Sequence, residues 1–169
     1  MPSVTSSMIG VDLNNQSSTA LFALGTKVFG TGDSEWQYCI ATGTLTTGMF
    51  VQVNPAGTAQ ALTTAVQNAA TVPVDLAVAQ YTITQGQYAF LAKRGQGIYV
   101  ACTGTIPMTV AVGLAPGSNG VLCTGALAIA GSTMAGIFLE ASASTATASI
   151  AQATLSWPRL PLVGTSVLG

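Results

Sequence analysis

Glycine and proline interrupt this chain every several residues, and between them the large apolar side chains occur in short groups. The strong helix formers Glu, Lys and Arg are scarce, whereas Thr, Val and Gly are abundant, and this composition favours strands over helices. Short apolar runs bounded by turn residues are typical of an all-β sandwich or barrel. We therefore predict an all-β fold, a single β-barrel or β-sandwich domain with an extended N-terminal arm and a C-terminal tail.

Two-residue alternation locates the first strand, at residues 36–40. Trp36, Tyr38 and Ile40 share one face there, because successive side chains of a strand point to opposite sides. Further strands are predicted at residues 49–53, 59–62, 76–80, 88–92, 98–102, 108–112, 121–123, 135–141 and 149–155. Residues 93–97 contain two glycines and are interpreted as the turn of a hairpin. For residues 63–72, one helical turn and a surface loop remain open.

The two ends of the chain lack the strand pattern. Residues 1–24 are rich in Ser, Asn and Gln and are predicted to form an N-terminal arm outside the core. The β-domain is expected to span residues 25–156. Residues 157–169 are expected to form a tail, because Pro158 and Pro161 exclude regular strand pairing at their positions. No basic segment followed by an apolar one opens the chain, so a secretory signal is not visible.

Charge is scarce along the whole chain. Only four basic and five acidic residues occur among 169, and His is absent, whereas an ordinary domain is about one-quarter charged. Such a chain has little electrostatic repulsion to keep its copies apart. Either it lies in a membrane or other protein covers much of its surface. The basic residues form no run, so we expect no nucleic-acid partner.

Residues 121–139 are the strongest candidate for a membrane span. They carry no charge, and at about 20 residues they are long enough to cross a bilayer. Their apolar side chains, however, come in short groups divided by Gly125, Gly131 and Gly136, whereas spanning helices are denser in large apolar residues. We predict short strands here and no membrane partner, which leaves coverage by other protein.

The chain offers little material for catalysis or for cofactor binding. Without His, neither a Ser-His nor a Cys-His pair can form. Cys39, Cys102 and Cys123 lack CxxC spacing and are predicted to be buried thiols rather than zinc ligands. Asp33 and Glu35 are interpreted as solvated loop charges, because residues two apart do not face each other across a substrate. We predict no catalytic, cofactor-binding or metal site, and no enzymatic activity.

Several segments follow one another in a strand–turn order. They are residues 25–30, 32–38, 45–53, 86–92, 95–100 and 153–159. Together they resemble the small β-rich head decoration, or cement, proteins of tailed bacteriophages, over residues 25–159. The resemblance implies a β-barrel or β-sandwich, usually trimeric, on the outer capsid surface at threefold and quasi-threefold positions. It assigns no binding residues.

On this resemblance we expect a structural virion protein that binds the outer capsid surface and cements neighbouring major capsid protein subunits, which stabilises the mature head. Its partners are the major capsid protein and further copies of itself, as a homotrimer. Each trimer bridges several capsid subunits, so that separation at one contact leaves the others holding.

Possible subunit or capsid contacts lie at both ends of the chain. Trp157 and Arg159 belong to the tail, and Leu13 and Phe22 belong to the arm. If neutral faces make the contacts, the rare charges of Lys93 and Arg94 are expected at solvent-facing or rim positions.

Two other functions remain open. One is a different virion component, such as a fibre, spike or tail protein, although fibres usually show longer periodic repeats than any visible here. The other is a carbohydrate-binding or adhesin β-domain, which uses exposed aromatic residues with Asn and Gln at a rim. Binding on a glycan array favours the carbohydrate-binding domain, and co-purification with capsids favours the cement protein.

Overall fold

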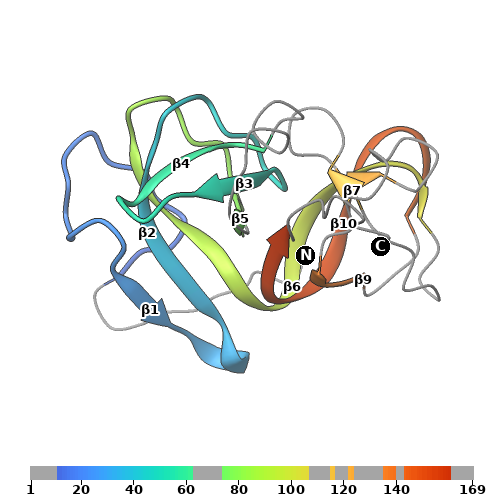
Figure 1. The fold of residues 1–169 in the computed structure, drawn as a ribbon, viewed down its shortest axis with the longest axis horizontal. Helices are drawn as coiled ribbons and strands as arrows, with labels where there is room; N and C mark the ends of the chain where they lie inside the picture. The colour runs from blue at the N-terminus through green and yellow to red at the C-terminus, as the bar shows by residue number, and fades with distance from the viewer. Residues whose placement is uncertain are drawn as a thin grey trace, which may run out of the picture.

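The computed structural model describes residues 11–62, 74–106, 115–116, 122–123, 135–139 and 143–160. Within them the chain is all-β, apart from one turn of 3-10 helix, η1 (Thr31–Asp33) (Figure 1). The strands are β1 (Lys27–Phe29), β2 (Glu35–Ala41), β3 (Phe50–Val53), β4 (Thr58–Ala61), β5 (Val74–Val78), β6 (Tyr88–Ile106), β7 (Ala115–Pro116), β8 (Leu122–Cys123), β9 (Ala135–Leu139) and β10 (Ala143–Leu160).

Five of these strands close into a barrel. Strand β2 pairs with β4 in parallel and with β6 antiparallel, and β3 joins β4 to β5. The barrel closes where β5 meets β6, at the pair Val78 and Ala92. Closure leaves these strands without open edges. The prediction of an all-β fold built on a β-barrel is confirmed.

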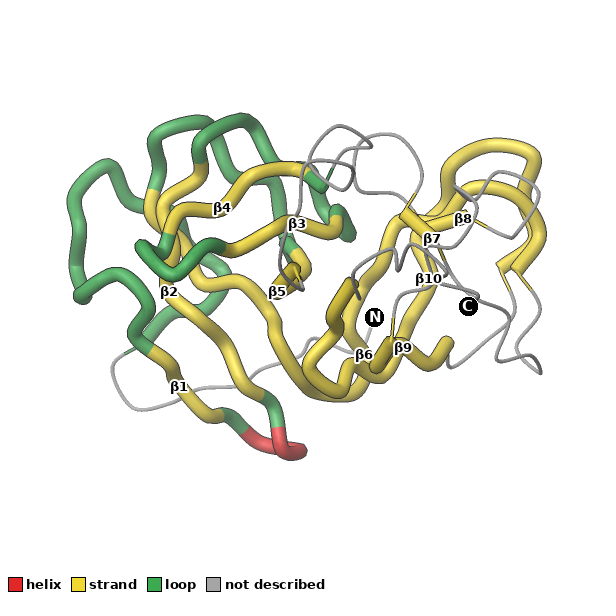
Figure 2. The backbone as a smooth tube through the Cα atoms, in the orientation of Figure 1, coloured by secondary structure: helices red, strands yellow, loops and turns green. Residues whose placement is uncertain are grey.

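Strands β6 and β10 continue beyond the barrel as a long antiparallel pair. They are 19 and 18 residues long, and their pairing extends to Ala143 opposite Ile106. Strand β9 lies along β10, and β8 and β7 follow on the other side of β6. Figure 2 shows this pair and its neighbours beside the barrel. The molecule therefore consists of a barrel and a strand extension that share β6.

The turn predicted at residues 93–97 is wrong, because β6 runs through it as one strand. Gly95 and Gly97 have positive φ angles of 138° and 67°, and the register with β10 shifts opposite them, between Ala153 and Leu155. Such a shift is a β-bulge, which bends a strand without ending it. The bulge lies where β6 passes from the barrel to its pairing with β10.

Most of the other predicted strands are confirmed. Those expected at residues 36–40, 49–53, 59–62, 76–80, 135–141 and 149–155 correspond to β2, β3, β4, β5, β9 and β10. Residues 63–72 and 108–112 lie outside the described part of the chain, as does most of 121–139. Among the described residues, no helix is long and apolar enough to cross a membrane.

Most barrel strands bury both of their faces, whereas β4 buries only the face of Ala59 and leaves Gln60 exposed. One face of each contributes to a cluster of mostly small side chains that draws on all five barrel strands and therefore fills the interior; it includes Cys39, Val51, Ala59, Ala77 and Leu91. The opposite face contributes larger side chains, among them Trp36, Tyr38, Phe50, Leu76 and Phe90, which pack against β9, β10 and the N-terminal segment. Small residues suit the interior because a five-stranded barrel is narrow.

The described N-terminal residues, 11–24, run along the outside of the barrel. The backbones of Ser17 and Tyr88 exchange two hydrogen bonds, of 3.0 and 2.8 Å. Leu13 is only 3% exposed and belongs to the core, whereas the sequence predicted that this segment lies outside it. The difference arises because a single apolar residue in a polar segment produces no periodic pattern that marks it as buried.

The C-terminal boundary also differs from the expected one. Strand β10 continues through Pro158, and Arg159 pairs with Asp75 of β5 and with Ala135 of β9. A register shift between Leu155 and Arg159 accommodates the proline, which cannot donate a ladder hydrogen bond. The strand therefore ends at Leu160, not before residue 157.

Candidate functional site

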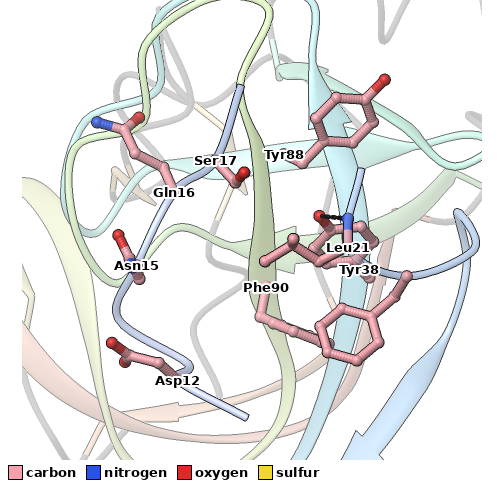
Figure 3. Close-up of a pocket in the computed structure, with 9 residues that line it drawn as sticks. Asp12, Asn15, Gln16, Ser17, Leu21, Tyr38, Tyr88 and Phe90 are labelled. Carbon is pink, nitrogen blue, oxygen red and sulfur yellow. Dashed lines mark hydrogen bonds between the residues drawn. The ribbon is translucent and has the colours of Figure 1, made fainter. Parts of the chain in front are cut away.

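A pocket of about 190 Å³ opens between the N-terminal segment and the outer face of β2 and β6 (Figure 3). The segment supplies the polar side chains together with Leu21 and Phe22, and the two strands supply the other aromatic rings. The lining residues are Asp12, Asn15, Gln16, Ser17, Leu21, Phe22, Tyr38, Tyr88 and Phe90.

Four aromatic rings form one wall of the pocket. Tyr38 of β2 and Phe90 of β6 are opposite each other in register, with ring centroids 4.9 Å apart. Tyr88 stacks on Tyr38 at 6.0 Å, with an angle of 15° between the rings. Phe22 meets Tyr38 and Phe90 edge-on, at 5.2 and 5.4 Å. Offset and edge-to-face pairs of this kind stabilise a rigid aromatic surface.

The polar wall is held by hydrogen bonds to the barrel. The Tyr81 hydroxyl donates to the backbone oxygen of Asn15 at 2.6 Å, and the Thr84 N–H donates to Oε1 of Gln16 at 2.8 Å. Burial raises the pKa of Tyr81, and the Asp12 carboxylate raises it further, so the hydroxyl keeps its proton and remains a donor. These bonds fix the segment while leaving the Asn15 side chain exposed.

The backbone of the segment is also tied to the aromatic wall. The N–H of Leu21 donates to the Tyr38 hydroxyl at 3.1 Å, as Figure 3 shows. The Ser17 hydroxyl turns back to its own segment, where it donates to the Thr19 carbonyl at 2.8 Å. The pocket thus joins a rigid aromatic surface to exposed amide and carboxylate groups.

Six of the nine charged residues form three ion pairs within the chain. Lys27 Nζ lies 2.7 Å from Glu35 Oε1, and Lys93 Nζ lies 2.5 Å from Asp75 Oδ1. The third pair joins Arg94 to Asp33. They neutralise most of the charge that the sequence carries.

Two sequence expectations about these charges are wrong. Lys93 was expected at a solvent-facing or rim position, but its side chain is only 2% exposed. It follows Ala89 and Leu91 at two-residue spacing, so it points into the barrel interior, where Asp75 compensates its charge. Glu35, expected in a solvated loop, is also buried, at 5% exposure, because it begins strand β2.

Arg94 and Asp33, the other residues named in these two expectations, are closer to the surface. The Arg94 side chain is 31% exposed and that of Asp33 is 69% exposed, so their ion pair lies at the surface.

Among the described residues, no group of three or more Cys, Asp or Glu side chains has the geometry to hold a metal ion.

The cysteines described here are buried and unbonded. Burial is the main cause that raises the pKa of Cys39 to about 12. The nearby charge of Lys93 lowers this pKa, and that of Asp75 raises it. Burial alone raises the pKa of Cys102 to about 11. Because the thiolate is the reactive form, both thiols are inert near neutral pH. The prediction of buried thiols is confirmed for these two, and the Cys123 side chain lies outside the described set.

The predicted contact residues lie in different environments. Leu13 is in the core, and Phe22 is partly buried in the aromatic wall of the pocket. Trp157 and Arg159 lie in β10, and their side chains are not among those described. The structure thus brings Leu13 and Phe22 to the same outer face of the barrel.

Exposed apolar side chains occur at other positions. Three of them, Leu21, Leu24 and Phe29, are 68%, 41% and 62% exposed and fall within residues 21–29, which include strand β1. Strand β1 is at the end of the sheet order, so among the described strands it pairs only with β2. Sequence reasoning missed this surface because Phe29 lies in a three-residue strand, too short for alternation to mark its outer face.

No protein-family model matches the chain, and no curated protein matches it.

Proposed function

We propose that this chain is a structural, non-enzymatic virion protein that binds the outer capsid surface as a homotrimer and cements neighbouring major capsid protein subunits. The observation that carries the proposal is the internal pairing of six of the nine charges. A surface that retains so little charge has weak repulsion between copies and is suited to being covered by neighbours.

The exposed apolar residues support the same function. Leu21 and Leu24 precede strand β1, and Phe29 is its last residue. The outer edge of β1 has no partner among the described strands. An unpaired strand edge and exposed apolar side chains are features that protein contacts cover. We therefore propose a subunit or capsid contact at Leu24, Phe29 and the outer edge of β1.

The capsid assignment comes from the sequence resemblance, and the physics of a cement protein is compatible with this fold. A stable contact buries about 1,600 Å² in total, which a barrel face with a neighbouring strand edge can supply. Binding to the assembled shell alone stabilises that shell by mass action. Repetition over many sites adds avidity without any chemical step.

The proposal is tested by adding the purified protein to emptied, expanded heads that lack it. We expect the protein to sediment with the heads and to raise the temperature at which they rupture. Phe29→Ser, which removes an exposed apolar side chain, should weaken binding, whereas Gln96→Ala, a control at an exposed polar position, should not. Heads that neither retain the protein nor gain thermal stability contradict the proposal.

A further inference from the structure

The pocket beside the N-terminal segment has a composition that coverage by a flat capsid surface does not require. Its lining combines four aromatic rings with polar side chains at Asp12, Asn15 and Gln16, and Figure 3 shows the polar residues on the segment that runs beside the strands of Tyr38 and Phe90. Ligand sites combine apolar and aromatic walls with a few placed polar groups in this way. The pocket therefore calls for a ligand that has an apolar face and a polar edge.

The aromatic wall is open to such a ligand at two of its rings. Tyr38 and Phe90 are each only 2% exposed and form the base, whereas Tyr88 and Phe22 are partly exposed. The contacts of Tyr88 and Phe22 with the base fix their orientation before any ligand arrives. A rigid aromatic surface stacks on the C–H face of a ring at low entropic cost.

The polar wall supplies complementary hydrogen-bonding groups. The side chains of Asp12 and Asn15 are exposed, and the bond from Tyr81 to the Asn15 backbone leaves the Asn15 amide available. An amide both donates and accepts, and a carboxylate accepts twice, which matches neighbouring hydroxyls that donate and accept. Ring hydroxyls stand at the edge of a sugar, next to its C–H face.

The charge and the volume of the pocket restrict the class of ligand further. The lining contains one carboxylate, Asp12, and no Lys or Arg, so it repels anions such as phosphate or an acidic sugar. The volume of about 190 Å³ lies below the roughly 300–1,000 Å³ of pockets for drug-sized ligands. One ring fits, and a longer chain must extend out of the pocket.

We propose that this pocket binds one neutral pyranose unit, with its C–H face against Tyr88 and Phe22 and its hydroxyls on Asn15 and Asp12. The site goes beyond capsid binding and is independent of it: a virion protein with this site holds a surface glycan in addition to its capsid contact. Failure of sugar binding leaves the capsid proposal unaffected.

The test is saturation-transfer NMR on the full-length protein with neutral methyl pyranosides, namely the glucoside, galactoside, mannoside and N-acetylglucosaminide. Sialic acid and inorganic phosphate serve as anionic probes. We expect at least one neutral glycoside to bind with a dissociation constant of about 1 mM or below. Saturation should be strongest at its ring C–H protons, and in protein-observed spectra the backbone shifts should change most in residues 12–17, Phe22 and Tyr88.

Two variants separate the site from non-specific binding. Asn15→Ala removes the exposed amide but keeps the backbone acceptor for Tyr81, so the fold is retained and affinity should fall about tenfold. Gln96→Ala, at an exposed position outside the pocket lining, should leave affinity unchanged. The proposal is overturned if no neutral glycoside binds, if Asn15→Ala binds as the unaltered protein does, or if an anionic probe binds more tightly.

Discussion

Lys93 places an ammonium group inside a barrel whose chain is almost without charge. Its side chain is 2% exposed, whereas that of its partner Asp75 is 49% exposed. The two ends of this ion pair therefore differ in what their loss leaves behind. A buried charge without a partner is far more costly than one that water can reach.

This asymmetry gives the first prediction. Asp75→Asn leaves the buried ammonium uncompensated and should lower the free energy of unfolding by about 3 kcal/mol. Lys93→Met keeps the apolar stem and leaves only a half-exposed carboxylate, so its cost should stay within about 1 kcal/mol. Urea denaturation measures both.

Asp33→Asn is the matched control, because its ion pair with Arg94 is at the surface and should contribute less than about 1 kcal/mol. Equal costs for Asp75→Asn and Lys93→Met would contradict the burial argument.

The Cys39 thiol gives the second prediction, on pH. Burial raises its pKa from 9.0 to about 12, so the folded chain holds the thiol proton to higher pH than the unfolded chain does. The contribution of this bound proton to the free energy of unfolding is complete below pH 9. As the pH rises toward 12 the contribution is lost, and the free energy of unfolding falls by roughly 2–4 kcal/mol over that range. Thermal unfolding across this window should show the decline.

Cys39→Ala removes this titration, and its unfolding temperature should therefore fall less steeply above pH 9 than that of the unaltered protein. A variant with the same slope would show that Cys39 is not responsible. Tyr81 adds to the decline in both proteins, because burial raises its pKa as well.

At the scale of the elements, β6 shows what sequence patterns can and cannot predict. Alternation located both halves of the strand, at residues 88–92 and 98–102, and the aromatic face that the pocket uses. It did not join them, because glycines at a bulge give the same local signal as glycines at a turn. The choice is made by β10, a partner distant in sequence, whose register shifts beside the bulge.

The turn before β3 gives the third prediction, because it packs directly on β6. Gly48 has φ +80°, and a Cβ there would lie 2.6 Å from the backbone nitrogen of Ala101. Gly86 has the same φ with open space around it, so its substitution measures the cost of the backbone conformation without a steric clash. Gly86→Ala should cost about 1–2 kcal/mol, and Gly48→Ala clearly more, by chemical denaturation. Equal costs would mean that the close approach to β6 is unimportant.

The N-terminal segment gives the fourth prediction. Removal of residues 1–24 deletes Leu13 and Phe22 and exposes the aromatic rings of Tyr38 and Phe90. The free energy of unfolding should therefore fall by several kcal/mol. Removal of residues 1–10 keeps these contacts, so its effect on the unfolding midpoint should be the smaller of the two. A deletion of 1–24 that is as stable as the full chain would show that the segment is a separate arm.

At the scale of the whole molecule, the sequence predicted the class of fold better than the site. Strand-length apolar groups divided by Gly and Pro indicated an all-β domain, and a closed barrel with a strand extension follows that pattern. The pocket was not predictable, because it unites a polar segment with a strand face, and only tertiary packing brings them together. The same holds for the ion pairs, whose members come from different elements.

In the folded chain, most of the few charged side chains are paired with each other. This internal pairing supports our proposal that other protein subunits cover the neutral surface. The proposed function is association rather than chemistry.

The decisive measurement of this association is the mass of the purified protein in solution, with and without emptied capsids. We expect a trimer that moves with the capsids when they are added. A monomer that ignores the capsids would contradict it.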